Sequence, residues 1–156
     1  MLFDAEDVTL LEVAVLVRDA MTRKNHTIRV DKKLAAARAI MDWASVAHLP
    51  VVDAQGALVG VITRETLQAA TPAVHDRSIP RAESDRKLAT TPVSNAIISD
   101  VPAVSADAAA WEAAELMSQH RVNFLPVIDR NRVAGIVTAS DLVDMAERAE
   151  PLLKSA

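Results

Sequence analysis

The stretch Leu125-Pro126-Val127-Ile128-Asp129, followed by Gly135-Ile136-Val137-Thr138, decides the fold because the chain contains this pattern twice. The earlier copy reads Leu49-Pro50-Val51-Val52-Asp53, followed by Gly60-Val61-Ile62-Thr63. The two prolines lie 76 residues apart and the two glycines 75, which places one missing residue in the turn of the later copy. Apolar positions farther upstream match at the same offset. The sequence is therefore an internal repeat of one supersecondary unit.

Each copy predicts the same order of elements: strand, helix, strand, hairpin turn, strand, helix. Residues 27–30 and 103–106 are short alternating runs typical of strands, and each is expected to lead into a helix capped by Asp31 or Asp107. Residues 32–44 carry apolar side chains at three- and four-residue steps, which predicts a helix with one buried face. The second copy predicts its counterpart.

The repeats divide the chain into a first repeat over 10–71, a linker over 72–92 and a second repeat over 93–148. Thr9-Leu10-Leu11-Glu12 has the pattern of a capping box and predicts the start of a helix. The linker is polar and proline-rich, and it predicts at most a short exposed helix over 84–88.

Composition narrows the class of protein. The chain has 156 residues, a net charge of −4, no cysteine and no apolar run long enough to cross a membrane. Its basic residues are scattered, which argues against nucleic acid as a partner. The acidic N-terminus lacks the basic start of a signal peptide. We expect a globular protein of the cytoplasm, without a membrane partner.

Patterns of catalysis and metal binding are missing from the sequence. The four histidines share no metal-ligand spacing, and no glycine-rich phosphate loop, nucleophile elbow or paired carboxylates occur. The chain is therefore expected not to be an enzyme and to hold no metal. Gly60 and Gly135 occupy matched strand positions, which indicates a close approach of another backbone.

The motifs together carry a resemblance to a known family. Residues 17–22, 27–31, 49–53 and 60–63 resemble, in this order, the successive blocks of a CBS domain, and the second half repeats the series. Two such domains in tandem resemble a Bateman module. The resemblance implies an α/β fold of the α+β type, with two pseudo-twofold-related repeats, each a small three-stranded sheet with flanking helices. It also implies that the two repeats pack through their sheets, leaving two clefts between them that bind adenine nucleotides, and that the module assembles into a homodimer.

A ribose site is expected where the last strand of the second repeat enters its helix. The Thr138-x-x-Asp141 pattern is similar to the ribose-binding pattern of CBS domains, and a carboxylate accepts hydrogen bonds from two vicinal hydroxyls. The first repeat has Thr63 and Thr66 at these positions, so its site is expected to be poorer or empty. The alternative interpretation is that Thr138 and Asp141 only cap the helix.

The rest of a nucleotide would need an apolar slot and a cation. Ala103, Val104 and Ile136 are the candidates for the adenine, although such residues are equally typical of a core. The family often places basic residues before the proline of the Leu-Pro block, where this chain offers only His48, with Arg64 and Arg121 nearby in sequence. So little positive charge favours a monophosphate or a nucleoside over a triphosphate.

The two tryptophans and four apolar helix residues are candidates for contacts between copies of the chain. Trp43 and Trp111 are expected in the core or at an interface rather than stacked on a base. Because helices of this family often form the dimer contact, Ile40, Met41, Leu116 and Met117 are candidates for it, although a core would use the same side chains.

The sequence thus predicts a regulatory sensor that binds an AMP-like adenine nucleotide and signals to an effector protein that the sequence does not identify. No cofactor is required; AMP, ADP, ATP and S-adenosylmethionine are the candidate regulatory ligands. The alternative is a ligand-free dimerisation or protein-interaction module in which Thr66 and the missing basic pair mark a decayed site.

Overall fold

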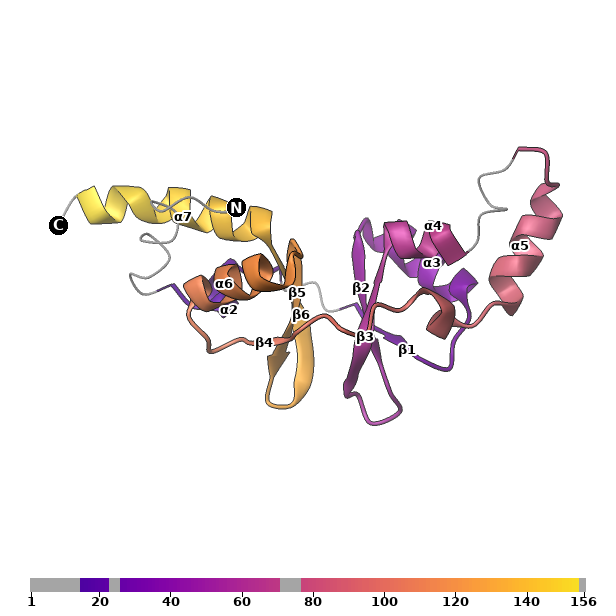
Figure 1. Cartoon of the computed structure of the whole chain (residues 1–156), viewed down its shortest axis with the longest axis horizontal. Helices are drawn as coiled ribbons and strands as arrows, with labels where there is room; N and C mark the ends of the chain where they lie inside the picture. The colour runs from indigo at the N-terminus through magenta and orange to yellow at the C-terminus, as the bar shows by residue number, and fades with distance from the viewer. Residues whose placement is uncertain (1–14, 23–25, 71–76, 155–156) are drawn as a thin grey trace. The chain divides into compact units, whose positions relative to one another are not determined.

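The computed structural model describes residues 15–22, 26–70 and 77–154, and these form two compact units (Figure 1). The first-repeat unit is His26–Asp100. The second-repeat unit contains the residues from Val101 onward together with residues 15–22. Each unit contains one three-stranded sheet with the same strand order. The α+β fold expected for a tandem repeat is therefore confirmed.

In the first-repeat unit, β1 runs parallel to β2, and β2 pairs antiparallel with β3. The three strands are β1 (Ile28–Arg29), β2 (His48–Val52) and β3 (Leu58–Thr63). The helical elements are α3 (Leu34–Ala44), α4 (Arg64–Ala70), α5 (Arg81–Thr90) and the 3₁₀ helix η2 (Val93–Ala96). The predicted order of elements is confirmed.

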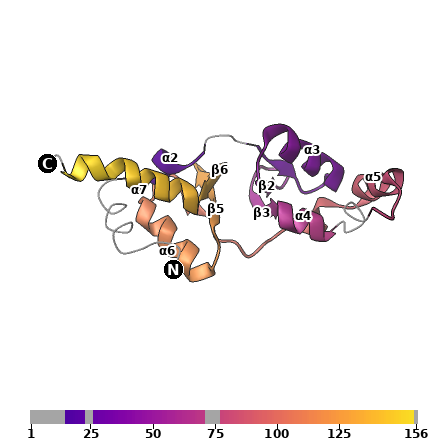
Figure 2. The same ribbon diagram turned by 90° about the horizontal axis from the view of Figure 1, so that it is seen from above.

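The second-repeat unit repeats this sheet with β4 parallel to β5 and β5 antiparallel to β6. Its strands are β4 (Val104–Ser105), β5 (Phe124–Asp129) and β6 (Arg132–Thr138). Its helices are α2 (Val17–Ala20), α6 (Ala110–His120) and α7 (Ala139–Lys154). In both views these helices lie on one side of the sheet (Figures 1 and 2).

Matched apolar positions build a core in each unit, between the sheet and the long helix. In α3, Leu34, Ala37 and Met41 are buried, as the helical spacing predicted. They pack with buried residues of the strands, among them Leu49, Val51 and Ile62. The equivalent core of the second-repeat unit contains Ala110, Ala113, Met117, Leu125, Val127 and Val137.

The residue missing from the second hairpin lies in its turn, as expected. Asp129 pairs with Arg132, which leaves Arg130 and Asn131 as the turn, and both have positive φ, 52° and 65°. Such dihedral angles match the twist of the two strands. In the first hairpin the residues between Val52 and Leu58 form a longer turn with Gly56 at φ 85°.

The predicted helix caps at Asp31 and Asp107 are wrong. The N-cap residues are Lys33 for α3 and Ala109 for α6, and neither provides a side-chain cap. Each aspartate lies two residues earlier, where the chain still turns away from the preceding strand. Asp31 instead pairs with Arg29, at 3.0 Å, and Asp107 pairs with Arg18.

Residues near the start of each repeat pack on the other repeat's sheet. Thr22 forms an antiparallel bridge with Ile136, and Ile98 forms one with Val61. At Gly60 an added Cβ would lie 2.5 Å from the carbonyl oxygen of Ile98, so that only glycine allows this approach. The close backbone approach predicted from the matched glycines is thus present. The compact units do not follow the order of the repeats along the chain.

Three further sequence predictions have different outcomes. The helix predicted over 84–88 is the longer α5, and it is not fully exposed because Ser84 and Leu88 are buried. A core position for Trp43 is wrong, because its side chain is 80% exposed, whereas Trp111 packs against the core. The capping box over residues 9–12 lies outside the described residues. Among those that are described, no helix is long and apolar enough to cross a membrane.

Candidate functional site

The strand-to-helix junction between β6 and α7 contains the Thr138 and Asp141 pair. The amide of Thr138 donates to Oδ2 of Asp141 at 2.9 Å, and the amide of Asp141 donates to Oγ1 of Thr138 at 3.2 Å. The two side chains therefore form a reciprocal cap, and the carboxylate lies in the first turn of α7, where the helix dipole favours negative charge. No hydrogen bond to Oδ1 of Asp141 is formed within the part of the chain that is described.

The corresponding junction between β3 and α4 has the same geometry without the charge. The amide of Thr63 donates to Oγ1 of Thr66 at 2.9 Å, and the amide of Thr66 donates back to Oγ1 of Thr63 at 3.1 Å. The Thr66 hydroxyl also donates to the carbonyl of Thr63 at 3.1 Å. The hydroxyl of Thr66 is thus used locally, and Thr63 is buried. At the capping position only the second-repeat junction has a carboxylate, although Glu65 lies in the first turn of α4.

The predicted adenine residues lie around the same sheet as Asp141 but differ in exposure. Ala103 is exposed at the start of β4, whereas Val104 is 5% exposed and belongs to the apolar core. Ile136 is half-buried on β6, and its carbonyl accepts a hydrogen bond from the amide of Thr22 at 3.3 Å. Ala103 and Ile136 are therefore the members of this group with exposed surface.

Of the predicted phosphate-binding residues, His48 and Arg64 lie in the first-repeat unit, whereas Arg121, the C-cap residue of α6, lies in the second-repeat unit. His48 is half-buried at the start of β2, directly opposite Thr63 on β3. Arg64 donates from Nη1 to Asp42 at 2.6 Å and from Nη2 to the carbonyl of Met41 at 2.9 Å. The guanidinium of Arg64 is therefore held by α3, and its predicted contribution to a phosphate site would require these contacts to break.

Sequence reasoning missed the segment that borders β6. Met21 and Thr22 approach Gly135 so closely that an added Cβ there would lie 2.7 Å from the carbonyl oxygen of Thr22 and 2.8 Å from Cε of Met21. The matched glycine signalled that some backbone approaches here. It did not reveal which segment, because the two are far apart in the sequence.

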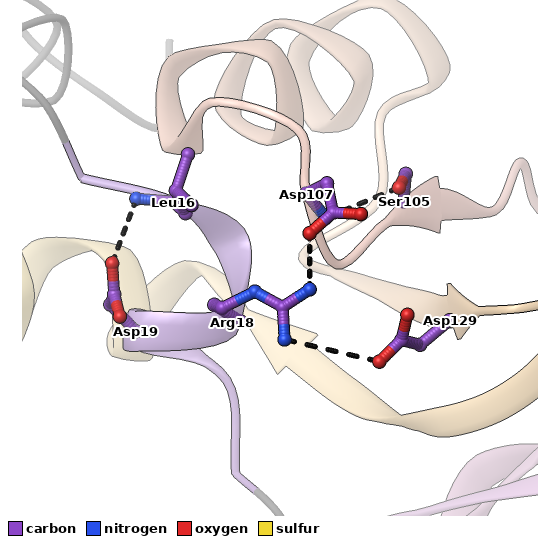
Figure 3. Close-up of polar contacts among 6 residues, drawn as sticks. All are labelled: Leu16, Arg18, Asp19, Ser105, Asp107 and Asp129. Atoms are coloured by element: carbon purple, nitrogen blue, oxygen red, sulfur yellow. Dashed lines mark hydrogen bonds and ion pairs between the residues drawn. The ribbon is translucent and has the colours of Figure 1, made fainter.

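Arg18 anchors this segment to the second-repeat unit (Figure 3). Its Nη2 donates to Oδ1 of Asp107, and its Nη1 lies 3.9 Å from Oδ2 of Asp129. The hydrogen bond to Asp107 is the main cause that raises the pKa of the Arg18 guanidinium above its ordinary value. The first turn of α2 is closed separately, because the amide of Leu16 donates to Asp19 at 3.1 Å. Arg18 thus joins α2 to the turn before α6 and to the end of β5.

The groups available at these junctions are suited to binding a ligand. Within the described residues, no group of three or more histidine, cysteine or acidic side chains is placed to hold a metal ion. No buried side-chain nitrogen or oxygen lacks a hydrogen-bond partner there. The β6–α7 junction offers one carboxylate oxygen, a threonine hydroxyl and half-buried apolar surface, which suit a ligand with hydroxyl donors and a flat apolar group.

Comparison with known proteins identifies relatives over most of the chain. The sequence model of the CBS domain matches residues 17–71 and 93–148. A CBS domain-containing protein of Dictyostelium discoideum is 36% identical over 134 residues, which cover 84% of this chain and 90% of that protein. Inosine-5′-monophosphate dehydrogenase of Methanocaldococcus jannaschii is 31% identical over 83% of this chain, but the match covers 22% of the enzyme.

Solved structures give the same result. The CBS domain of a CBS domain-containing membrane protein from Sphaerobacter thermophilus has a TM-score of 0.76 and 25% identity, covering 88% of this chain and 92% of that one. A CBS domain pair in complex with 5′-methylthioadenosine and S-adenosyl-L-methionine has a TM-score of 0.67 and 25% identity, covering 86% and 97%. Both chains are covered almost completely.

Proposed function

Because the chain belongs to the CBS-domain family, with one domain over 17–71 and another over 93–148, we propose that it is a regulatory module that senses an adenine nucleotide of the AMP type. The ligand is proposed to bind at the β6–α7 junction of the second-repeat unit. In this proposal the carboxylate of Asp141 and the hydroxyl of Thr138 hold the ribose, while Ala103 and Ile136, the predicted adenine residues with exposed surface, border the adenine.

The observation that carries this proposal is the geometry of Asp141. One of its carboxylate oxygens caps α7, and the other accepts no hydrogen bond from the described residues, so it is available to a ribose hydroxyl. A charge-assisted hydrogen bond of this kind contributes about 1.5–3 kcal/mol. The related CBS domain pair in complex with S-adenosyl-L-methionine and 5′-methylthioadenosine supports an adenosine-containing ligand.

The two junctions are proposed to differ in affinity. Thr66 replaces the carboxylate with a hydroxyl that already donates to the carbonyl of Thr63, so the first-repeat junction, with Thr63 and His48, is the weaker or empty site. With Arg64 held by Asp42, few cations remain for phosphate, which favours AMP over ATP. S-adenosylmethionine, which carries no phosphate, is the other candidate.

The proposal is regulatory and assigns no catalysis to the chain, because the relation to the dehydrogenase covers only 22% of that enzyme. Ligand binding shifts a population only as far as its preference for one state allows. We propose that the protein is a homodimer and that the shift is read by an effector protein.

A ligand-free interaction module is the second candidate. It is favoured by the hydrogen bonds themselves, because Asp141 caps α7 in the way that Thr66 caps α4. If capping is the whole role of Asp141, no nucleotide is needed and the module acts by association alone.

A matched substitution separates the two functions. Asp141→Thr recreates the threonine cap of the other junction and removes the carboxylate, so the fold is preserved while the ribose contact is lost. Thermal shift is measured with AMP, ADP, ATP and S-adenosylmethionine on the wild type, on Asp141→Thr and on Thr66→Ala. At a ligand concentration of about 100 times Kd, binding stabilises the native state by about 2.7 kcal/mol.

We expect AMP to raise the melting temperature of the wild type and of Thr66→Ala, and to leave Asp141→Thr unchanged. A shift that persists in Asp141→Thr would place the ligand elsewhere. No shift with any of the four ligands at millimolar concentration would favour the interaction module. ATP binding more tightly than AMP would contradict the proposed preference for a monophosphate.

A further inference from the structure

A second concave surface lies in the first-repeat unit, between α3 and α5. It encloses about 600 Å³, which is within the usual range of small-molecule sites. Its more buried lining consists of the half-buried Ala35, Arg38 and Ile79 and the buried Ser84 and Leu88. All residues of this groove belong to the first-repeat unit, whereas Asp141 belongs to the second-repeat unit. The groove is therefore distinct from the β6–α7 junction.

The polar lining of the groove is rich in arginine. Arg38 lies 3.7 Å from Asp42, and Asp42 is also paired with Arg64 at 2.6 Å. Arg77 and Arg81 line the groove as well, are exposed, and have no ion pair with any described residue. Asp85 is the other acidic residue of the lining. Since two arginines already neutralise Asp42, positive charge is in excess around the opening.

The start of α5 adds to this charge. The helix has ten residues, and its N-cap Pro80 provides no side-chain acceptor for the first amides. Arg81 is the first residue of the helix, and Arg77 precedes it by one turn of chain. An anionic group that both guanidinium groups can reach would receive planar, paired donors, the arrangement that best suits carboxylate and phosphate oxygens.

We propose that the groove between α3 and α5 binds a small organic anion, with its carboxylate or phosphate headgroup at Arg77 and Arg81 and its apolar body against the half-buried Ala35 and Ile79. A small molecule fits these observations better than a polypeptide because the concave surface is limited to two helices and the turn before α5. The proposal does not depend on nucleotide binding at Asp141.

Phenyl phosphate and benzoate are suitable probes because they share an apolar ring and differ in the headgroup, and phenol is the uncharged control. Binding is followed by amide NMR titration of the full chain. Arg77→Gln combined with Arg81→Gln removes both charges at exposed positions and keeps polar side chains. Arg86→Gln is the matched control, since Arg86 is exposed on the same helix but does not line the groove.

We expect at least one of the two anions to shift amide resonances of α3 and α5, and phenol to shift none. Loss of both charges is expected to weaken binding by about tenfold or more, as removal of charged hydrogen bonds does, while Arg86→Gln stays within about twofold. Asp141→Thr is expected to bind the anion as the wild type does, which separates this site from the nucleotide site.

The relative affinities of phenyl phosphate and benzoate identify the headgroup. The proposal is overturned if neither anion binds more tightly than about 10 mM. It is also overturned if the double variant and the wild type bind equally, or if the shifted resonances map to the second-repeat unit. Binding of a polyglutamate peptide to the groove without binding of either small anion would likewise contradict a small-molecule site.

Discussion

Gly60→Ala tests whether Ile97 and Ile98 are held against β3 as the structure shows. A Cβ at this position would collide with Cγ2 of Ile97 and lie 2.5 Å from the carbonyl oxygen of Ile98. The side chain of Ile97 can rotate, but the carbonyl is fixed by two backbone hydrogen bonds between Ile98 and Val61, at 2.8 and 3.0 Å. The variant must therefore move the backbone of this segment away from β3.

The loss of stability in Gly60→Ala can be estimated from the backbone hydrogen bonds that this movement breaks. Each backbone hydrogen bond contributes about 0.5–1.5 kcal/mol net, so loss of the pair costs about 1–3 kcal/mol. Alternatively, the segment with Ile97 and Ile98 stays beside β3 and the added Cβ strains the packing. Overpacking of this kind also costs about 1–3 kcal/mol. Either way we expect the free energy of unfolding to fall by about 1–3 kcal/mol, measured by urea denaturation.

Amide hydrogen exchange then distinguishes detachment from retained strain. The amides of Val61 and Ile98 are expected to lose protection in Gly60→Ala while those of β2 keep it. Gly56→Ala is the control, because nothing lies within 4 Å of the added Cβ and its cost comes from the positive φ of 85° alone. It is expected to leave both amides protected. If Gly60→Ala unfolds within about 0.5 kcal/mol of the wild type with both amides protected, the packing described for this segment is refuted.

Four other substitutions test separate parts of the structure. Met117→Ala empties a fully buried core position and is expected to cost about 2–5 kcal/mol in urea denaturation; a cost below about 1 kcal/mol would contradict the core assignment. Trp43→Ala is expected to change the free energy of unfolding by less than about 0.5 kcal/mol in the isolated chain, because the side chain is 80% exposed; a larger loss would contradict that exposure. Arg130→Gly is expected to stabilise the hairpin by up to about 1 kcal/mol, since φ is 52°; destabilisation would argue against the left-handed turn. Arg18→Gln is expected to lower the melting temperature at low salt and to differ less from the wild type at about 0.5 M NaCl, because exposed ion pairs are screened; a difference that grows with salt would contradict the pairing with Asp107.

The candidate site was predictable from the sequence only in part. The repeat placed Thr138 and Asp141 at the equivalent of Thr63 and Thr66, and the structure shows both pairs forming the same reciprocal cap. An acidic residue before a helix predicts an N-cap, which is why the sequence favours Asp31 and Asp107 as caps. The chain needs two further residues to turn before the helix begins, a detail of backbone path that residue type does not specify.

The groove between α3 and α5 was likewise not predictable from the sequence. Residues 72–92 were interpreted as a linker because they are polar, and polar composition is a local property. The buried side chains of Ser84 and Leu88 show instead that one face of α5 packs on the first-repeat unit. One large apolar residue, Leu88, in a polar helix is a weak signal, so only the tertiary structure reveals this packing and the concave surface beside it.

The sequence by itself determined the repeated unit, the hairpins and the buried helix faces, because periods of two and of three to four residues fix which side chains share a face. Only the tertiary structure decided that a short segment near the start of each repeat packs on the other repeat's sheet, with Thr22 beside Ile136 and Ile98 beside Val61. The physical reason is that each of these segments is only two or three residues long, too short to show a periodic pattern of apolar side chains from which its packing could be predicted. Their position is set by where a glycine leaves room and where unpaired strand groups accept hydrogen bonds, and both conditions depend on residues distant in the chain.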